Sequence, residues 1–382
     1  MAIQSFQIHV PESVLADLRE RIKRTRWPDE VTGSEWIFGA GLSYMKELAD
    51  YWASRFDWRR TEDDVNRYPQ FMAEIDGYRI HFLHIRSGGT AARPLVLLHG
   101  WPGSFLEMME LIPLLSNNAD MPFDLVIPSL PGYGFSQKVT TPGCGVQPMA
   151  RLVNRLMESL GYGSFGIHGG DFGSGVGTAL ALKYPERVIG LHLNNIEGYY
   201  RPFLPEGRSL TPEETQFERE SEAWYEKEGA YSHQQRTKPL TLAYGLNDSP
   251  VGLCAWIIEK FHGWSDCRGE IESVFTKDEL LSNVTLYWVT ETVHSSFRLY
   301  HESREAPLHF GIEDFVKVPV GIAHFPLEAP FPPRTYIERG YNVRHWTDMP
   351  AGGHFPSMEQ PELLAGDIVR FFRDLRDATP IS

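Results

Sequence analysis

Cysteine is scarce in this chain of 382 residues, which contains only Cys144, Cys254 and Cys267. Their odd number and unpaired spacing exclude a disulfide-rich scaffold and fit a reducing cytoplasm. The sequence also lacks a Cys/His cluster and a His-Glu-x-x-His motif, the patterns typical of zinc sites. We therefore expect a cytoplasmic protein that needs no metal and no other cofactor.

Long apolar runs and uninterrupted basic runs are missing as well. Nowhere do about 18 apolar residues follow one another, and the first residues do not combine a basic region with an apolar one, so we expect neither a membrane span nor a signal peptide. The 50 acidic residues outnumber the 36 basic ones, which gives a net charge of -14. Such a charge disfavours nucleic acids and anionic membranes as partners.

Hydrophobic residues make up 42% of the sequence and aromatic residues 13%, enough for a substantial buried core. The length fits one large α/β domain with an insertion. Strand patterns alternate with helical ones, which predicts an α/β fold with a mostly parallel sheet flanked by helices. The predicted strands are Tyr78–Ile85, Pro94–Leu98, Phe123–Ile127, Val188–Leu193, Val318–Ile322 and Asn342–Trp346.

Two regions depart from this alternation. Amphipathic stretches at Pro11–Arg24 and around Trp52 predict an N-terminal helical arm that lies across the main domain. After Glu197 the pattern is mostly helical, which predicts a lid inserted above the sheet. The predicted organisation is an arm at 1–75, a first part of the core at 76–197, a helical lid at 198–315 and a second part of the core at 316–382.

The stretch Gly169-Gly170-Asp171-Phe172-Gly173 lies between an apolar strand pattern and a helix pattern rich in Gly, Ala and Leu. Strand, tight glycine turn and helix are typical of a nucleophile elbow. Glycines at 169 and 173 are expected because so sharp a turn leaves no room for side chains. The usual central residue is Ser, but no Gly-x-Ser-x-Gly motif occurs, so a serine-hydrolase mechanism is poorly supported.

The Asp at the centre of the turn selects a different chemistry. A carboxylate is already ionised at neutral pH and needs no base to become a nucleophile. Asp171 can therefore displace at a saturated carbon and form an alkyl ester, which water must then cleave. The alternative is a glycine-rich turn with an incidental Asp, so other motifs have to decide.

The stretch His99-Gly100-Trp101-Pro102-Gly103 directly follows the buried strand that ends at residue 98. In sheets of this kind the loop after an early strand supplies one backbone N–H of an oxyanion hole, and the residue after the nucleophile supplies the other. The expected donors are Trp101 and Phe172. An ordinary Gly-Pro turn is the alternative, but the position upstream of the elbow favours the oxyanion hole.

Of the 14 histidines, His354 is the one placed both by its loop and by the chain order of nucleophile, acid and His. We predict that it is the general base. The acid that orients it should follow a late strand, which favours Glu328. The second candidate for this acid is Glu197, which follows the strand after the elbow. Asp348 is closer to His354 in sequence, but just past the last strand it is poorly placed to reach the imidazole.

Together these motifs resemble the microsomal-type epoxide hydrolases, a family of the α/β-hydrolase fold. The resemblance covers nearly the whole chain and implies that fold, with an inserted helical lid and an N-terminal arm. The segments that carry it include His99–Ser104, Pro128–Ser136, Gly169–Gly173, Gly245–Gly252 and Gly352–Phe355.

The resemblance, and not spacing, also implies roles for single residues. The family uses two lid tyrosines to hydrogen-bond the epoxide oxygen, and by local match these are Tyr231 and Tyr300. Glu328 matches the family's acid. There are two departures. We expect no N-terminal anchor of the kind that membrane-bound relatives carry, and therefore a soluble enzyme. Phe172 stands where Trp is common, without the indole N–H that halide-binding relatives use.

The expected activity is therefore hydrolysis of a hydrophobic epoxide, with water, to a vicinal diol. Haloalkane dehalogenation and a non-catalytic ligand-binding role are the alternatives. Detoxification, including aromatic hydrocarbon catabolism, and natural-product biosynthesis are both open, as are a monomer and a homodimer. Residues expected to contact substrate are Trp101, Phe172 and Trp288, and further lid aromatics that suggest a hydrophobic pocket are Trp224, Tyr225, Trp256, Trp264 and Phe297.

Overall fold

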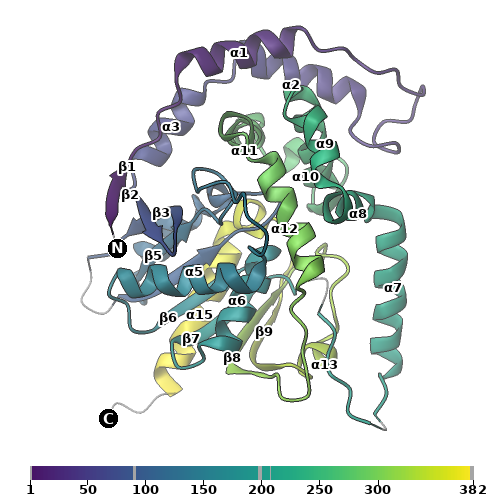
Figure 1. The fold of residues 1–382 in the computed structure, drawn as a ribbon. Helices are drawn as coiled ribbons and strands as arrows, with labels where there is room; N and C mark the ends of the chain where they lie inside the picture. The colour runs from purple at the N-terminus through teal and green to yellow at the C-terminus, as the bar shows by residue number, and fades with distance from the viewer. Residues whose placement is uncertain (1, 89–91, 197–199, 207, 379–382) are drawn as a thin grey trace.

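The computed structural model describes residues 2–88, 92–196, 200–206 and 208–378, and its centre is a nine-stranded sheet (Figure 1). The sequence patterns place most strands correctly. The strands are β1 (Ile3–Phe6), β2 (Gln70–Ile75), β3 (Tyr78–Ile85), β4 (Arg93–Leu98), β5 (Phe123–Pro128), β6 (Phe165–Gly169), β7 (Val188–Leu193), β8 (Val316–His324) and β9 (Tyr341–Asp348).

The sheet is mixed but mostly parallel, in the order β1-β2-β3-β5-β4-β6-β7-β8-β9. From β5 across to β9 the neighbouring strands run parallel, whereas β1, β2, β3 and β5 pair antiparallel. Asp76 and Gly77 join β2 to β3 with φ angles of 49° and 84°, the left-handed pair that a tight hairpin needs. The predicted mostly parallel α/β sheet is confirmed.

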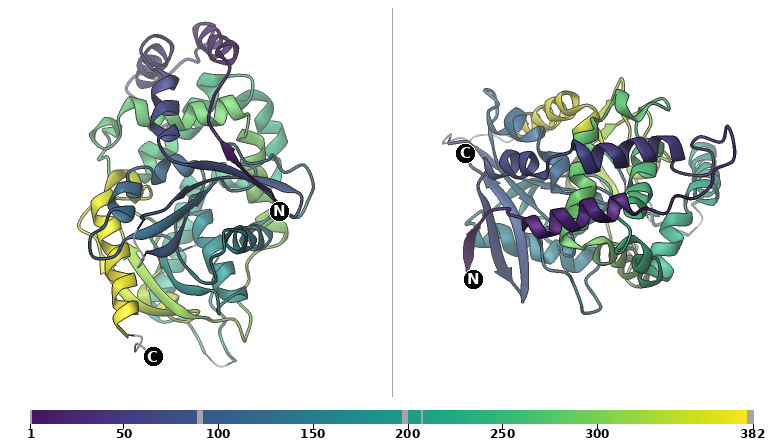
Figure 2. Two further views of the ribbon diagram at one scale, coloured as in Figure 1. Left: turned by 90° about the vertical axis from the view of Figure 1, so that its left-hand side faces the viewer. Right: turned by 90° about the horizontal axis from the view of Figure 1, so that it is seen from above.

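Helices cover both faces of the sheet (Figure 2). On one face α5 (Val146–Ser159) packs on α6 (Phe172–Lys183), and on the other α15 (Pro361–Ala378) packs on α4 (Leu111–Ser116). Gly166 and Gly321 on two strands make room for α15, because a Cβ at either would lie within 3 Å of Phe372 or Phe371. These glycines let the helix lie close to the strands beneath the elbow.

A chain of buried polar residues also ties α15 to the strands. His168 Nδ1 lies 2.9 Å from His192 Nδ1, and His192 Nε2 lies 3.1 Å from Asp367 Oδ2. His345 Nε2 lies 2.9 Å from the other oxygen of Asp367. Burial holds the pKa values of His168 and His192 below the ordinary value, while hydrogen bonds to His192 and His345 outweigh burial and hold the pKa of Asp367 well below its own. The Asp367 carboxylate is therefore ionised, and each of its oxygens accepts a hydrogen bond from a histidine.

The lid predicted at 198–315 is mainly helical between Pro212 and Glu305, and its described residues outside these bounds form loops. Its first helix begins with a capping box, in which Thr211 and Glu214 exchange hydrogen bonds with each other's backbone N–H. The stretch from Leu280 to Tyr300 is divided at Glu291, which adopts φ 51° and ends one helix before the next begins. The lid elements are α7 (Pro212–Glu228), α8 (Ala230–Thr237), α9 (Pro239–Leu246), α10 (Pro250–Trp264), η2 (Ile271–Ser273), α11 (Lys277–Thr290) and α12 (Val293–Glu305).

The N-terminal arm is not only helical, which corrects the predicted arm at 1–75. Strands β1 and β2 belong to it and extend the sheet at its antiparallel edge. Three helices, α1 (Glu12–Lys23), α2 (Leu42–Ser54) and α3 (Trp58–Asn66), lie between these strands in sequence and pass over the lid (Figure 1). The chain therefore leaves the sheet, crosses the lid and returns to the sheet.

Specific hydrogen bonds join the arm to the lid helix α11. Trp52 Nε1 donates to Thr285 Oγ1 at 2.9 Å, and the Tyr51 hydroxyl donates to Asp278 at 2.9 Å. Trp52 is only 2% exposed, so its ring fills space between the two units. The arm is thus part of the hydrophobic core and not an appendage.

Short elements complete the fold. They are η1 (Phe105–Met108), α13 (Arg334–Ile337) and α14 (Pro356–Glu359). Among the residues that the structure describes, no helix combines the length and the apolar character needed to cross a lipid bilayer.

Replacing Trp52 with Ala should destabilise the protein. The change leaves a cavity between arm and lid and removes the bond to Thr285, and truncation of a buried aromatic residue costs about 3–5 kcal/mol. Chemical denaturation followed by circular dichroism measures the free energy of unfolding. The control is Phe38→Ala in the same arm, at a side chain 77% exposed, which should stay within about 0.5 kcal/mol. Equal losses in both variants would contradict this account of the arm.

Candidate active site

The turn between β6 and α6 holds Asp171 in a backbone conformation that most residues avoid. Its φ is 47° and its ψ is -130°. Such a conformation costs on the order of 1–3 kcal/mol and persists only where the surroundings impose it. The turn thus presents the carboxylate at the end of a central strand, as the sequence predicts for a nucleophile elbow.

Glycines allow the chain to approach this closely. A Cβ on Gly173 would lie 2.2 Å from the carbonyl oxygen of Leu98, and one on Gly169 would lie 2.6 Å from the carbonyl oxygen of Gly173. A Cβ on Gly100 would lie 2.2 Å from Asp171 Oδ1. No side chain fits at these positions, so the physical reason predicted for glycines 169 and 173 is confirmed.

The loop after β4 places a hydrogen-bond donor against the carboxylate. The N–H of Trp101 donates to Asp171 Oδ1 at 2.8 Å, so one of the two expected oxyanion donors is within bonding distance of the acid. The lid holds this loop in place, because Asn283 Nδ2 donates to the Pro102 carbonyl at 2.8 Å and the Tyr287 hydroxyl donates to the Gly103 carbonyl at 2.7 Å. Phe172 directly follows Asp171 and is the first residue of α6. Its backbone N–H therefore stays the predicted second donor of the oxyanion hole.

His354 lies between the two acids. Its Nδ1 is 2.8 Å from Glu328 Oε2, and its Nε2 is 3.6 Å from Asp171 Oδ2. An ionised carboxylate can only accept, so Nδ1 carries a proton toward Glu328 and Nε2 is the nitrogen that faces the nucleophile. The predicted set of Asp171, Glu328 and His354 is brought together.

Two residues that the sequence did not single out support this arrangement. Asn195, two residues after β7, donates from Nδ2 to Glu328 Oε1 at 2.6 Å, which leaves the other oxygen for His354. Glu359 accepts from the backbone N–H groups of Phe355 at 2.8 Å and Gly353 at 3.0 Å. Its carboxylate thus fixes the loop on either side of His354.

Two opposing effects set the protonation of His354. Burial disfavours the imidazolium, but the charges of Glu328 and Asp171, with hydrogen bonds to both, outweigh burial and raise the pKa of His354 well above its ordinary value. The resting site therefore favours an imidazolium between Asp171 and Glu328.

The alternative acids do not pair with His354 among the described residues. Asp348 lies 2.9 Å from His324 Nδ1 and 3.0 Å from Trp346 Nε1, and these partners occupy its carboxylate. Glu197 lies outside the described residues. Glu328 therefore takes the position predicted for it.

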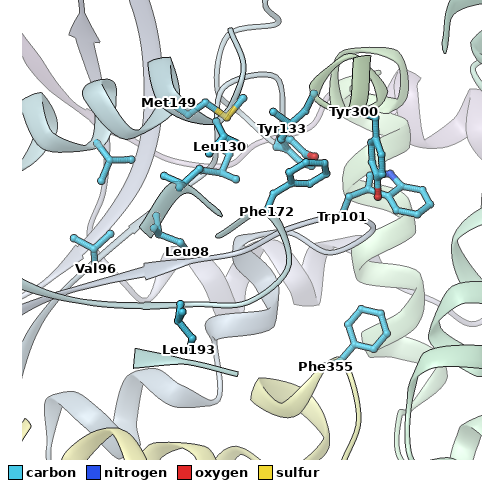
Figure 3. Close-up of a cluster of buried hydrophobic side chains, with 14 of the residues drawn as sticks. Val96, Leu98, Trp101, Leu130, Tyr133, Met149, Phe172, Leu193, Tyr300 and Phe355 are labelled. Carbon is cyan, nitrogen blue, oxygen red and sulfur yellow. The ribbon is translucent and has the colours of Figure 1, made fainter. Parts of the chain in front are cut away.

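A cavity of about 130 Å³ lies between the sheet and the lid, with Asp171 and His354 in its wall. We name it the front cavity. Tyr231 from α8 and Tyr300 from α12 line it as well, with ring centroids 6.0 Å apart and rings nearly perpendicular. Trp101 stacks on Tyr231 at 5.3 Å and meets Tyr300 edge-on at 5.7 Å, and Figure 3 shows Trp101 beside Tyr300. One indole thus fixes both phenols.

The aromatic residues expected to contact substrate divide into two groups. Phe172 and the lid residues Trp224, Tyr225 and Trp264 line the front cavity. Trp288 does not line it, which corrects that expectation. It lies on the side of α11 that faces the arm, where the Arg21 guanidinium is 5.9 Å from its ring centroid.

Three further aromatic residues take part in packing. Trp101, also expected to contact substrate, does not line the front cavity either; it is 1% exposed and packs against both tyrosines. Phe297 is fully buried in the core, and Trp256 donates from Nε1 to Gln235 at 2.9 Å. Within the part of the chain that the structure describes, no group of three or more His, Cys, Asp or Glu side chains is placed to hold a metal ion.

Comparison with known proteins places the chain in a family. Residues 3–108 match the family model for the epoxide hydrolase N terminus, and residues 93–226 match the model for the alpha/beta hydrolase fold. Over 98% of its length the chain is 41% identical to a putative epoxide hydrolase from Stigmatella aurantiaca, of which the match covers 86%. It is 36% identical to epoxide hydrolase 1 of Sus scrofa over 97% of this chain and 88% of that protein.

Solved structures give the same result. The epoxide hydrolase of Aspergillus niger superimposes with a TM-score of 0.86 at 32% identity, over 98% of this chain and 97% of that one. The juvenile hormone epoxide hydrolase of the silkworm Bombyx mori gives a TM-score of 0.86 at 32% identity, over 99% of this chain and 95% of that one. The resemblance inferred from the motifs is thereby confirmed: this chain belongs to the microsomal-type epoxide hydrolase family of the α/β-hydrolase fold.

Proposed function

We propose that this enzyme hydrolyses a hydrophobic epoxide to a vicinal diol through an alkyl ester on Asp171. The observation that carries the proposal is that a carboxylate nucleophile and two phenols, Tyr231 and Tyr300, line one cavity together with His354. A strained ether needs a nucleophile at carbon and a proton donor at oxygen. This cavity offers both, and lid aromatics line much of the rest.

In the first step Asp171 attacks one epoxide carbon from the side opposite its C–O bond. A bond forms between the carboxylate oxygen and that carbon, and the epoxide C–O bond breaks. Tyr231 and Tyr300 donate hydrogen bonds to the departing oxygen, and one of them gives it a proton. The Lys260 ammonium, 4.7 Å from the Tyr231 ring centroid, stabilises negative charge that develops on that phenol.

In the second step water attacks the ester carbonyl of Asp171 while His354 Nε2 takes one of its protons. The N–H groups of Trp101 and Phe172 hold the oxyanion, each worth about 2.7–4 kcal/mol. The bond between the carbonyl carbon and the alkyl oxygen then breaks, and His354 returns its proton to that oxygen. The acid re-formed on Asp171 ionises, and its proton returns to His354, which regains its resting imidazolium form. One diol oxygen therefore comes from Asp171.

Ester formation also changes the charge around the base. It neutralises Asp171, which removes one of the two anions that raise the pKa of His354. The pKa of His354 then falls, so the imidazolium gives its Nε2 proton to the tyrosinate left by the first step and becomes able to accept a proton from water. His354 is thus protonated while Asp171 is the nucleophile, and it becomes a neutral base only after the first step has formed the ester.

Haloalkane dehalogenation, which shares the carboxylate nucleophile, has less support. It needs N–H donors for a halide, and Phe172 carries none in its side chain. The two tyrosines that line the front cavity serve an oxygen leaving group. A non-catalytic role is disfavoured because Asp171, His354 and Glu328 lie at bonding or ion-pair distances.

Racemic styrene oxide and 1-chlorobutane together test the reaction class. We expect diol from the epoxide by chromatography and no chloride from the chloroalkane by ion-selective electrode. In His354→Gln the ester should form and persist, because no base activates water, and intact-mass measurement should show the adduct. His309→Gln, at an exposed histidine, is the matched control and should turn over normally. Chloride without diol, or normal turnover by His354→Gln, would sink the proposal.

Replacing Tyr231 and Tyr300 together with Phe should slow ester formation by roughly 10²–10⁴-fold, because the departing oxygen loses its proton donors. Rapid-quench measurement of ester formation in the first turnover separates this step from hydrolysis. Tyr244→Phe, at a lid side chain 74% exposed, is the control and should leave both rates unchanged. A double variant that slowed only ester hydrolysis would contradict the assigned roles.

Asp171→Asn mimics the neutral ester and should lower the pKa of His354. Of the two acids that raise this pKa, Asp171 and Glu328, only Glu328 then remains. The variant should also form no adduct with an epoxide. Nuclear magnetic resonance titration of labelled imidazole measures the pKa. The control is Asp348→Asn, which removes the partner of His324 and should leave His354 unchanged. An unaltered His354 in Asp171→Asn would refute the proposed coupling.

A further inference from the structure

A second, much smaller cavity lies on the other side of Asp171 from the tyrosines. We name it the rear cavity. Its volume is about 20 Å³, and its wall includes Asp171, His354, His168, Asn194 and Glu107. Asp171 and His354 line both cavities and so form the wall between them. The reacting carboxyl group is thus accessible from two sides.

The size and chemistry of the rear cavity match a single water molecule. A buried water needs a space of about 10–15 Å³ and two to four polar partners. The rear cavity exceeds that volume but has no room for an organic substrate. Carboxyl, imidazole and amide groups in its wall supply the partners. Substrate and water can therefore occupy opposite sides of the nucleophile.

Glu107 is the one carboxyl group in this wall to which the mechanism gives no role. It lies in η1, and its side chain folds back over the loop that carries Trp101. A Cβ on Gly103 would lie only 1.0 Å from Glu107 Oε1, so the absence of a side chain at 103 makes the space for this carboxyl group. The Ser104 N–H hydrogen-bonds it. Its place beside the nucleophile is therefore defined by the backbone.

We propose that Glu107 is a positioning residue that holds the hydrolytic water in the rear cavity for attack on the Asp171 ester. This inference rests on the proposed epoxide hydrolysis and adds the site of the second reactant. One water proton points to Glu107 and the other to His354 Nε2, which directs an oxygen lone pair toward the carbonyl carbon of Asp171. His354 takes its proton as the oxygen–carbon bond forms, and Glu107 itself gains and loses no proton.

The electrostatics of the site agree with this role. Burial raises the pKa of Glu107 to about 8, with the cation of His354 opposing the shift and the anion of Asp171 adding to it. When Asp171 becomes an ester, its repulsion of the Glu107 carboxylate disappears, but the stabilising cation of His354 is lost as well, so the hydrogen bond to water must not depend on the ionisation of Glu107. A protonated carboxyl group still keeps an oxygen that accepts a hydrogen bond.

Glu107→Gln tests the role without changing the size of the side chain. The amide oxygen of Gln accepts the hydrogen bond from the Ser104 N–H, so the amide NH₂ group faces the water. This group donates a hydrogen bond where the water needs an acceptor. We expect ester formation from styrene oxide within about 3-fold of the unmodified enzyme and ester hydrolysis slower by roughly 10- to 100-fold. The ester then accumulates in the steady state, and kcat and KM fall together.

Gly103→Ala is a second variant that keeps the carboxyl group and moves it. The added methyl would occupy the position of Glu107 Oε1, and a flexible side chain can give way. We expect the same selective loss of ester hydrolysis. The matched control is Glu110→Gln, three residues along the chain and exposed, which should leave both rates unchanged.

Rapid-quench intact-mass measurements on all four proteins give both rates. The proposal is overturned if Glu107→Gln and Gly103→Ala hydrolyse the ester at the normal rate, or if ester formation slows as much as hydrolysis, as a merely structural role predicts. Failure of the proposed function looks different: neither the unmodified enzyme nor His354→Gln then forms an ester with styrene oxide or any member of an epoxide panel. A normal melting temperature in either Glu107→Gln or Gly103→Ala shows that its rates report on a folded site.

Discussion

The structure depends on the close approach of β4, β6 and the first turn of α6. Three backbones meet where Gly100, Gly169 and Gly173 carry no side chains, and this contact forces Asp171 into its strained conformation. The same contact sets the Trp101 N–H at 2.8 Å from the carboxylate. The strain costs on the order of 1–3 kcal/mol. The packing of α15 and the buried chain of His168, His192 and Asp367 stabilise the sheet that imposes it.

Charge gives the site its order of events. The charge of Asp171 contributes to raising the pKa values of both His354 and Glu107, so neutralising Asp171 in the proposed ester removes that contribution from both groups. In the proposed mechanism the nucleophile of the first step therefore influences the base of the second through its charge. Because Asp171 and His354 also separate the two cavities, the two reactants need not compete for the same space.

Much of this could be predicted from the sequence, because the parallel strands, the elbow and the base loop are local patterns. Strand β1 escaped prediction because its residues are mostly exposed and show no alternation of burial. Asn195 and Glu107 escaped because a single polar residue gains meaning only from partners far along the chain. Trp288 was assigned wrongly for a related reason: adjacent residues of the α11 helix point about 100° apart, so that Tyr287 meets the loop after β4 while Trp288 meets the arm.

The path of the arm has a consequence for how such enzymes can be recombined. Trp52 of the arm bonds to Thr285 of α11, and two turns of the same helix place Asn283 and Tyr287 on the loop that carries the oxyanion donor. The arm, the lid and the loop after β4 are therefore joined by direct contacts, although core segments separate the arm from the lid in the sequence. A chimaera that takes its arm from one homologue and its lid from another breaks this part, whereas exchanging both as one block preserves it.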